Sequence, residues 1–549
     1  MIDALPFGWP TVVHLLDDAV RRSPDATAIV CGDEALVYRE YAACVAGLAH
    51  ELNEAGIGAG SRVVLVMENS IDIAIATFGV QAAGAQVVPL NPAYTASELA
   101  PMLVDAAPAG VIHDSAVAAT LQPLLTAFRR QLPVASDGPI SGESEPAQIK
   151  KAGASRSDPT RPAQPVLGIE IGPQARRLTS WRDRPDLADR LPLPDPDSLS
   201  TLQYTGGTTG RAKGVDLTHR AVAINVSQRE ALLPTEPDAE RVLAITPLFH
   251  VYAVSMGLYL AAACRGTLVV LPRSRPEAVL DAIARHRITL MAASPTIFVG
   301  LMASDRFATA DLASLRLCYS GASALAEATL QRWERATGCP IVEGYGQSEA
   351  GPVLSYNPRE GVRKVGTVGV AVPGTQIEIV DARTGCDLLP VGQIGEIRAR
   401  GPQVMRGYRN RPDETAAALR DGWLYTGDLG ELDADGYLTI RGRSKEMAIV
   451  GGFNVYPREV EEALCTHPAV REAAVVGVPD AYRGEALVAT VAISPADAVS
   501  GADLIEYLAS RLVRYKVPRE IRFVEALPKT TVGKVDKARL RAELAADSS

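Results

Sequence analysis

Several features that would assign this chain to a class of protein are absent. Its seven cysteines are scattered, odd in number and without a CxxC pair, which argues against a disulfide framework or a zinc site and favours a reducing cytosol. It has no basic surplus, since 55 Lys and Arg stand against 64 Asp and Glu. This balance argues against a bulk nucleic-acid binder, and we expect no nucleic-acid partner.

The sequence also has no long apolar run and no recognisable leader. Its first residues, MIDALPFGWP, lack the basic start and apolar core of a signal peptide. The longest apolar run, Val251 to Cys264, is shorter than the ~18–20 residues of a membrane-spanning helix, so we expect a buried helix there. We therefore expect a cytoplasmic protein, and leave peripheral association with the inner membrane surface open.

Alternating patterns along the chain predict an α/β fold. With 549 residues the chain exceeds the ~100–200 residues of a typical domain, so two or more structural units are expected. Continuous apolar strands such as RVVLVM (62–67) and QVVPL (86–90) flank an Ala-rich helical segment at 73–85. This alternation is typical of parallel sheets that are covered by helices on both faces.

Three later segments depart from this pattern. Residues 135–197 are rich in Ser, Pro, Gly and charge, which predicts a surface insertion or flexible loop without a catalytic role. From about residue 366, short strands with Gly and Asp turns indicate a smaller β-rich unit. After Arg443 an α+β pattern begins, with helices at 457–464 and 504–512 and strands at 473–478 and 487–493, and this predicts a separate small domain.

The stretch QYTGGTTGRAKGVDLTH, residues 203–219, predicts a phosphate-binding loop. Glycines let successive backbone amides approach an anion, while threonine hydroxyls and Lys213 add donors and charge. The stretch is not a GxxxxGK[ST] loop, because Ala212 precedes the lysine and Gly214 follows it. On its own it would also suit a flexible glycine-rich hairpin, which is the alternative to phosphate binding.

Six further motifs follow this stretch in a fixed order. They are PLFHVY (247–252), YSGASAL (319–325), VEGYGQSE (342–349), GWLYTGDLG (422–430), GRSKEMAIVGGFNVYP (442–457) and LPKTTVGKVDK (527–537). Together, the seven closely resemble the acyl-adenylate-forming superfamily of acyl-CoA synthetases, luciferases and peptide-synthetase adenylation domains. Phrases such as LQYTGGTTG and GPQVMRGY look most like bacterial long-chain fatty-acid–CoA ligases.

The resemblance implies a reaction in two steps. A carboxylic acid and ATP give acyl-AMP and pyrophosphate, with Mg²⁺ on the phosphates, and coenzyme A then gives acyl-CoA and AMP. The implied fold is a large N-terminal domain of stacked mixed sheets and helices, here residues 1–442, and a small mobile α+β domain, here 443–549, that rotates between the steps. A homodimer is left open.

The resemblance also implies a nucleotide site. The residues that would cradle the β- and γ-phosphates are Thr205, Gly207, Thr208, Thr209 and Lys213. Glu349 would hold Mg²⁺, which commonly takes one carboxylate with phosphates and waters, and Ser348 would bond the α-phosphate or acyl carbonyl. The residues that resemble the adenine pocket are Gly321, Ala322, Glu343, Gly344 and Tyr345. Asp428 would accept hydrogen bonds from both ribose hydroxyls, and Arg443 would contact ribose or phosphate.

Four other positions are implied to act in catalysis or CoA binding. Lys534 would stabilise charge at the acyl carboxylate and α-phosphate during adenylation, and Lys445 would be the hinge between the domains. His250 would gate the acyl and pantetheine tunnels. Gly451 and Gly452 predict a strand with no side chains on one side, over which the pantetheine arm would pass.

The identity of the acid stays open at this stage. Small residues after His250, namely Ala253, Val254 and Gly257, leave room for an aliphatic chain in an apolar tunnel, so we favour a medium- to long-chain fatty acid. A dicarboxylic, alicyclic or aromatic acid would fit the same motifs, and a carrier-protein thiol could replace CoA. A catalytically silent lipid or acyl-AMP binder is the non-enzyme alternative, against which Lys213, Glu349 and Lys534 argue.

Overall fold

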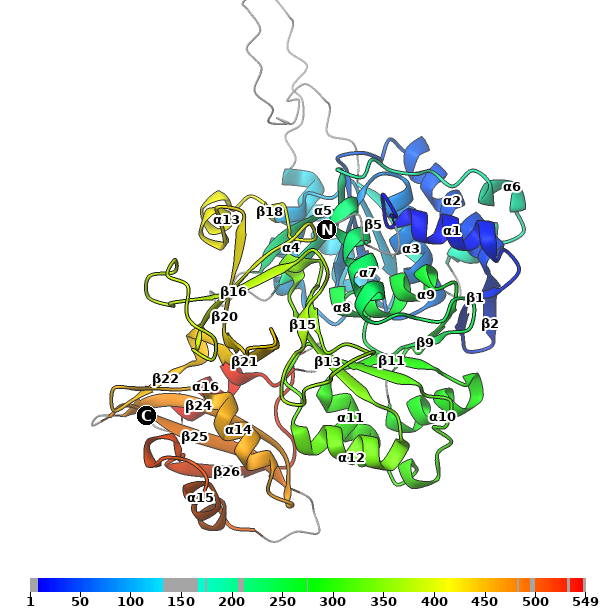
Figure 1. The fold of residues 1–549 in the computed structure, drawn as a ribbon. Coiled ribbons are helices and arrows are strands. Elements are labelled where there is room, and N and C mark those ends of the chain that lie inside the picture. The colour runs from blue at the N-terminus through cyan, green and yellow to red at the C-terminus, as the bar shows by residue number, and fades with distance from the viewer. Residues whose placement is uncertain are drawn as a thin grey trace, which may run out of the picture.

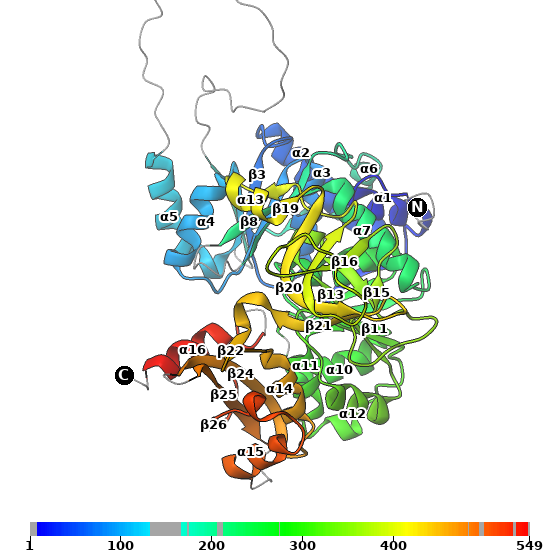
Figure 2. The same cartoon turned by 60° about the vertical axis from the view of Figure 1, so that its left-hand side comes forward.

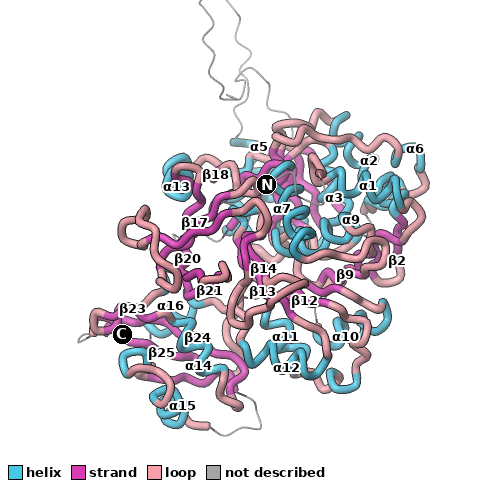
Figure 3. The backbone as a smooth tube through the Cα atoms, in the orientation of Figure 1, coloured by secondary structure: helices cyan, strands magenta, loops and turns pink. Residues whose placement is uncertain are grey.

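The protein is described here by a computed structural model that covers residues 8–131, 166–172, 175–205, 212–273, 275–480, 483–493, 499–530 and 534–546. The chain forms a large N-terminal domain of mixed sheets and helices and a smaller C-terminal α+β domain, coloured orange to red in Figure 1. Figure 3 shows how strands run through the interior of each part, with helices around them. The α/β class predicted from the sequence is confirmed.

The larger sheet of the N-terminal domain has nine strands. Its order is β15 (Val370–Ala371), β14 (Val353–Tyr356), β13 (Ile341–Gly346), β12 (Leu317–Ser320), β11 (Leu290–Ala293), β9 (Arg241–Ala244), β10 (Thr267–Val270), β1 (Thr27–Cys31), β2 (Glu34–Val37). The six strands from β13 to β1 are mutually parallel, and antiparallel strands close both ends. This agrees with the predicted parallel sheet, because its central strands are buried.

A second sheet of seven strands carries the glycine-rich stretch. Its order is β18 (Gly407–Tyr408), β8 (Lys213–Thr218), β7 (Leu199–Thr205), β4 (Gln86–Leu90), β3 (Arg62–Val66), β5 (Gly110–Asp114), β6 (Leu167–Ile171). Strands β7 and β8 are antiparallel, so they form the two arms of a hairpin on either side of that stretch. Strand β18 arrives from nearly 200 residues later and pairs with β8.

Helices pack on both sheets. They are α1 (Val13–Arg22), α2 (Tyr38–Glu54), α3 (Ile71–Ala82), α4 (Ala96–Ala106), α5 (Ala118–Gln131), α6 (Pro185–Ala188), α7 (His219–Leu232), α10 (Pro276–His286), α11 (Pro295–Met302) and α12 (Glu327–Thr337). Every residue of α3 is buried. Gly79 lets α3 approach α2 closely, since a Cβ there would lie 2.7 Å from Leu48 Cδ2. One core thus joins α1, α2 and α3 to both sheets.

The apolar run after His250 forms a buried helix with an unusual middle. It consists of α8 (Val251–Ala253), a π-helix (Val254–Tyr259) and α9 (Leu260–Ala263). Its residues are buried, except that Val251 is partly buried, so the predicted buried helix is confirmed. No described helix is both long and apolar enough to cross a membrane. Short π segments are frequent at functional sites.

The expectation of an insertion over 135–197 is wrong for its second half. Residues 132–165 lie outside the described part of the chain, but Leu167–Ile171 forms β6 and pairs in parallel with β5. Arg177 then makes an ion pair with Asp72 of α3 at 2.7 Å. The composition of the segment hid a short edge strand and an anchoring arginine, because both are surrounded by Ser, Pro and charged residues.

The β-rich unit predicted from about residue 366 is present. Its strands are β16 (Gln376–Val380), β17 (Gly395–Arg400), β19 (Leu419–Arg420), β20 (Trp423–Leu432) and β21 (Leu438–Arg443), with α13 (Pro412–Ala418) beside them. They form one antiparallel sheet around a small core of its own.

The C-terminal domain has a separate sheet and core. Its elements are β22 (Ala448–Val450), β23 (Phe453–Val455), α14 (Pro457–Cys465), β24 (Val470–Asp480), β25 (Gly484–Ile493), α15 (Gly501–Ala509), β26 (Glu520–Val524) and α16 (Lys537–Ala546). The domain lies beside α11 and α12 of the N-terminal domain in both Figure 1 and Figure 2. There Lys529 Nζ donates to Thr296 Oγ1 at 3.4 Å and pairs with Glu472 at 2.6 Å.

Candidate active site

The glycine-rich stretch is held at both ends by the β7–β8 hairpin. Thr205 and Lys213 face each other in the ladder, and Thr205 Oγ1 lies 3.5 Å from the Lys213 carbonyl oxygen. The predicted phosphate-binding residues Gly207, Thr208 and Thr209 lie outside the described residues. The hairpin therefore brings the start of the predicted loop next to its lysine.

Glu349 lies in a short 3₁₀ turn, Ser348–Ala350, that follows β13. Its side chain is 8% exposed, and its Oε1 accepts a hydrogen bond from Tyr408 Oη at 2.8 Å. The Lys213 ammonium lies 5.0 Å from the centre of the Tyr408 ring. Tyr408 thus contacts both the predicted phosphate-binding lysine and the predicted metal ligand, although the sequence motif that contains it suggested no role for it.

Asp428 forms the centre of a second polar group. It is 5% exposed on β20, where its Oδ2 accepts from Tyr345 Oη at 2.6 Å and its Oδ1 lies 3.2 Å from Arg443 Nε. Arg443 is its partner across the β20–β21 ladder. Burial raises the pKa of Asp428, while the Arg443 charge acts in the opposite direction. The structure therefore brings together three residues that the sequence assigned to adenine, ribose or phosphate.

Lys534 joins these groups from the C-terminal domain. Burial lowers the pKa of its ammonium and Arg443 lowers it further, whereas Asp428, Glu349 and Glu446 raise it. The Lys534 amide donates to Thr530 Oγ1 at 3.2 Å, which fixes the backbone beside it. A lysine near the end of the chain thus lies in the electrostatic field of two acidic residues of the N-terminal domain.

His250 lies directly before helix α8. It caps α8, since its Nδ1 accepts from the Tyr252 amide at 3.3 Å. Burial lowers the pKa of the imidazole to about 3, and the Lys534 charge adds to that effect. The imidazole is therefore neutral at physiological pH, which suits a packing or gating role better than proton transfer.

The predicted adenine-pocket residues lie at the carboxyl ends of parallel strands, where α/β sheets commonly bind ligands. Gly321 follows β12, and a Cβ there would lie 2.9 Å from the Tyr252 ring; a Cβ on Gly344 would lie 2.4 Å from the Tyr356 ring. The rings of Tyr252 and Tyr356 therefore leave no room for a side chain at either glycine. Ala322 adopts a left-handed φ of 69°, which turns the chain away from the sheet.

Glu343 lies within β13, and one backbone amide holds its carboxyl. It is 5% exposed, and its Oε1 accepts from the Leu325 amide at 3.0 Å. Burial raises the pKa of its carboxyl to about 7, and the Arg458 charge on α14 acts against this rise. Glu343 thus faces the C-terminal domain, and Arg458 is an interface residue that the sequence reasoning missed.

Three predicted residues lie on exposed parts of the C-terminal segment. Lys445 belongs to an exposed 3₁₀ turn, Ser444–Glu446, directly after β21. The prediction of a strand through Gly451 and Gly452 is wrong, because these residues form the turn between β22 and β23 with φ of 60° and 84°. Only glycine adopts this pair of left-handed conformations without strain, and the hairpin lies at the outer edge of the domain in Figure 3.

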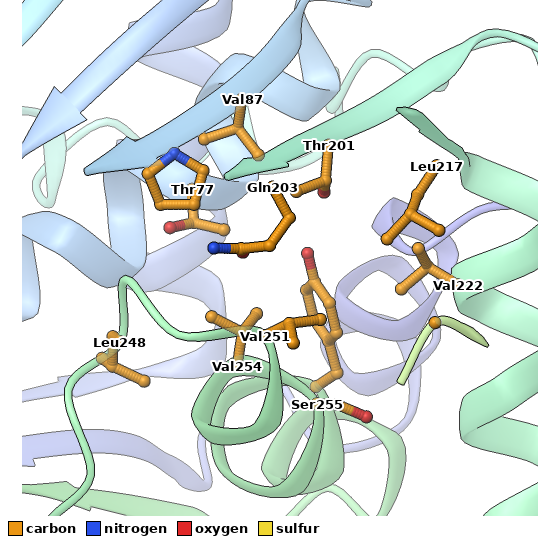
Figure 4. A pocket seen from close by; sticks show the side chains of 13 residues that line it. Thr77, Val87, Thr201, Gln203, Leu217, Val222, Leu248, Val251, Val254 and Ser255 are labelled. Carbon is orange, nitrogen blue, oxygen red and sulfur yellow. The ribbon is translucent and has the colours of Figure 1, made fainter. Parts of the chain in front are cut away.

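An apolar cavity lies between the second sheet and the helix that follows His250. It contains about 400 Å³ of empty space, including the part open to solvent. Figure 4 shows side chains of the second sheet on one side and of the π-helix on the other. The lining residues are Thr77, Val87, Pro89, Thr201, Gln203, Leu217, Val222, Leu248, Val251, Val254, Ser255, Tyr259 and Gly351.

Several residues that line the cavity are close in the sequence to His250 and Glu349. Leu248 and Val251 flank His250, Gly351 is two residues from Glu349, and Gln203 Nε2 donates to the Phe249 carbonyl at 3.3 Å. Of the small residues that the sequence suggested for an acyl pocket, Val254 lines this cavity and Ala253 and Gly257 do not. The strand and α3 residues were missed because they lie far from His250 in the sequence.

Cations and carboxylates that suit a nucleoside triphosphate, placed next to a cavity that suits an acyl group, define an enzyme that activates a carboxylic acid as its adenylate. The AMP-binding enzyme family matches residues 16–409, and the AMP-binding enzyme C-terminal domain matches residues 459–534. The chain belongs to this family. It is an adenylate-forming acyl-CoA ligase, and such enzymes use ATP and CoA.

Two characterised relatives and one solved structure are similar over nearly the full length. Long-chain-fatty-acid–CoA ligase of Bacillus subtilis (strain 168) is 36% identical, over 98% of this chain and 95% of the relative. Feruloyl-CoA synthase of Amycolatopsis sp is 35% identical, over 95% and 96%. The crystal structure of ATP-bound MatB from Rhodopseudomonas palustris matches with a TM-score of 0.83 at 30% identity, over 97% and 98%.

Proposed function

We propose that the protein is a fatty-acid–CoA ligase that acts on medium- to long-chain acids through acyl-AMP. The observation that carries the choice of acid is the cavity beside His250. Six aliphatic side chains line it, namely Val87, Leu217, Val222, Leu248, Val251 and Val254, and none of the described residues that line it is Lys, Arg or His. An alkyl chain gains free energy by leaving water there, whereas the second carboxylate of a dicarboxylic acid would lack a cation.

The fatty-acid ligase of Bacillus subtilis supports the same choice by similarity. A second candidate is an aromatic acid, since a feruloyl-CoA synthase is almost as similar. Against it, aliphatic side chains outnumber aromatic ones around the cavity, where Tyr259 is the one aromatic residue among the described lining residues. Polar groups of the cavity, including Thr201 and Tyr259, leave room for an oxygenated chain.

In the first step, an oxygen of the acid attacks the α-phosphorus of ATP and pyrophosphate leaves. We assign Thr205 and Lys213, with Gly207, Thr208 and Thr209 of the loop, to the β- and γ-phosphates. Lys534 would stabilise the charge that develops at the acyl carboxylate and α-phosphate, because a preorganised cation acts most strongly where water is excluded. The opposing charges around it keep the ammonium in the site before the substrates bind.

Glu349 fits a Mg²⁺ ligand by its chemistry. It is a buried carboxylate with a hydroxyl donor as partner. The described residues contain no cluster of three or more metal-binding side chains, which agrees with a cation that takes one protein carboxylate and completes its shell with phosphates and water. Mg²⁺, when bound, would neutralise charge on the phosphates. Asp428 would accept from the ribose hydroxyls, with Tyr345 and Arg443 holding it in place.

In the second step, the thiol of CoA attacks the acyl carbonyl and AMP leaves. We propose that residues 443–549 rotate for this step, with Lys445 as the hinge. The support is that the charges of Asp428 and Glu349 act on Lys534, whereas Gly451 and Gly452 form an exposed turn. Rotation would bring the glycine turn to the pantetheine arm. Neutral His250 would separate the acyl cavity from the thiol entrance.

The test is pyrophosphate release and acyl-CoA formation with ATP, Mg²⁺ and CoA across a panel of acids. The panel contains C4 to C18 fatty acids, malonate, benzoate and ferulate. We expect the highest kcat/KM within the C8–C18 acids and equal amounts of pyrophosphate and acyl-CoA. A preference for ferulate, benzoate or malonate would overturn the choice of acid, and pyrophosphate without acyl-CoA would overturn CoA as acceptor.

A further inference from the structure

Tyr408 reaches the active site on a strand of only two residues. It stands opposite Val215 of β8, two residues after Lys213. The Tyr408 amide donates to Thr415 Oγ1 at 2.9 Å, and the next residue, Arg409, donates its amide to the Gly214 carbonyl at 2.8 Å. The backbone of Tyr408 is therefore fixed against the strand that carries the predicted phosphate-binding lysine.

The same segment holds Glu349 at two points. The Tyr408 hydroxyl donates to Glu349 Oε1 at 2.8 Å, and the Met405 amide donates to the Glu349 main-chain oxygen at 2.8 Å. Hydrogen bonds to an ionised group are roughly twice as strong as those between neutral groups. Residues 405–408 thus donate hydrogen bonds both to the backbone and to the carboxylate of Glu349.

The ring of Tyr408 contacts Lys213. The Lys213 ammonium lies 5.0 Å from the ring centre, within the ~6 Å of a cation–π contact. Among the described residues, neither Lys213 nor Glu349 takes part in an ion pair. Each charge contacts a neutral part of the same tyrosine, Lys213 the ring and Glu349 the hydroxyl, and the charges of Arg443 and Lys534 also act on Glu349.

We propose that Tyr408 is a positioning residue that keeps Lys213 and Glu349 apart and available for Mg–ATP. Because Lys213 and Glu349 contact the same side chain, loss of that side chain would leave them free to form a direct ion pair, which ATP binding would have to break. A neutral hydroxyl and an aromatic face are weaker competitors than a full charge. The inference rests on the proposed roles of Lys213 and Glu349 in ATP binding.

The test is ATP affinity by isothermal titration calorimetry without acid or CoA, once with Mg²⁺ and once with EDTA. Tyr408→Phe removes the hydroxyl and keeps the ring, and we expect it to weaken Mg–ATP binding ~10-fold with little change in EDTA. Tyr408→Leu removes both, so direct pairing of Lys213 with Glu349 should weaken binding under both conditions. The Mg²⁺ concentration for half-maximal pyrophosphate release should rise in Tyr408→Phe, with conversion of supplied acyl-AMP unchanged.

Tyr437 provides a matched control in the β-rich unit. Its hydroxyl donates to the Val362 carbonyl, and the Lys364 ammonium lies 4.4 Å from its ring centre. Tyr437→Phe and Tyr437→Leu therefore lose the same two kinds of contact away from the site, and ATP affinity should stay at the wild-type value.

Two results would overturn the inference. One is wild-type Mg–ATP affinity in Tyr408→Phe, and the other is an equal loss in Tyr408→Phe and Tyr437→Phe. Near-ultraviolet circular dichroism checks the fold of each variant, and Tyr408→Phe decides the outcome if Tyr408→Leu does not fold. Wild-type protein that binds ATP equally with Mg²⁺ and with EDTA would instead contradict the proposed role of Glu349, and the role of Tyr408 with it.

Discussion

The two ends of the C-terminal domain have opposite relations to the active site. The segment with Lys534 lies among Asp428, Glu349 and Arg443, whereas the hairpin with Gly451 and Gly452 is exposed at the outer edge. Both segments carry family motifs, so both are expected to act. This difference is what the proposed rotation of residues 443–549 requires, and variants that affect one half-reaction alone test it.

The largest expected effect is that of Lys534→Ala on adenylation. Loss of a preorganised charge-stabilising group costs ~10²–10³ in rate, so pyrophosphate release should fall by that factor, while conversion of supplied acyl-AMP and CoA changes little. Lys537→Ala is the control, since Lys537 pairs with Glu461 at 2.8 Å inside its own domain. Equal losses in both half-reactions would contradict the division of labour between the two motifs.

Glu343→Gln tests the burial of Glu343 through the pH dependence of protein stability. Burial raises the pKa of Glu343 to about 7, but an unfolded glutamate titrates near ~4.3. Between these values the folded protein keeps a proton that the unfolded chain has lost, so stability falls as the pH rises through this window. Glutamine stays neutral, so Glu343→Gln should be more stable than wild type by ~2–3 kcal/mol at pH 8 and equal near pH 4.5.

Differential scanning calorimetry from pH 4.5 to 8 measures this difference. Arg458→Gln serves as the companion variant, because the Arg458 charge lowers the pKa of Glu343 and its loss should move the window to higher pH. Parallel Tm–pH curves for wild type and Glu343→Gln would show that Glu343 is not held in a buried position against the C-terminal domain.

Lys445→Pro should give the opposite phenotype to Lys534→Ala. Proline fixes φ near −65°, so a hinge that must change its torsion would be locked in the present arrangement. Adenylation should persist, and thioester formation should fall roughly tenfold, the equivalent of ~1.4 kcal/mol in barrier height. Lys445→Ala, which keeps the backbone free, should behave as wild type. Unchanged single-turnover thioester formation in Lys445→Pro would exclude Lys445 as the hinge.

The smallest effect is expected from Gly452→Val in the exposed turn. A left-handed conformation costs a branched residue ~1–2 kcal/mol, and the side chain would stand where the pantetheine arm is proposed to pass, so KM for CoA should rise several-fold. Gly436→Val is matched to it, with φ of 81° and open space around it. It should lower Tm similarly without changing KM for CoA. Equal KM values in the two variants would separate the turn from CoA binding.

Local sequence pattern predicted much of the fold but not all of it. Strands such as β3 and β4 are apolar after their first residue, and the local sequence alone identifies them. Strand β6 was missed because its alternation of Leu167, Ile169 and Ile171 spans only five residues beside a Ser- and Pro-rich segment, and among the described strands it pairs with β5 alone. Similarly, the turn at Gly451 and Gly452 was predicted as a strand because two adjacent glycines leave the local pattern ambiguous.

The sequence also predicted only part of the candidate active site. Motif order predicted Glu349, Asp428 and Lys534, and the structure brings these residues together across three separate segments. Tyr408 had no predicted role because its contact with Glu349 spans 59 residues and depends on a two-residue strand. The cavity wall was mostly missed because tertiary packing alone brings α3 and β7 to the helix after His250.

Because the segment from Val254 to Tyr259 is a π-helix, the number of residues in it determines the shape of the cavity wall. Hydrogen bonds from residue i to i+5 place one more residue in a turn than the i to i+4 bonds of an α-helix. Removing one residue here would restore α geometry and rotate Val251 relative to Tyr259, both of which line the cavity. Deletion of one residue from this segment would therefore change the cavity wall more than any one substitution. Such a deletion would change the shape of the cavity and leave every predicted nucleotide-binding residue in place.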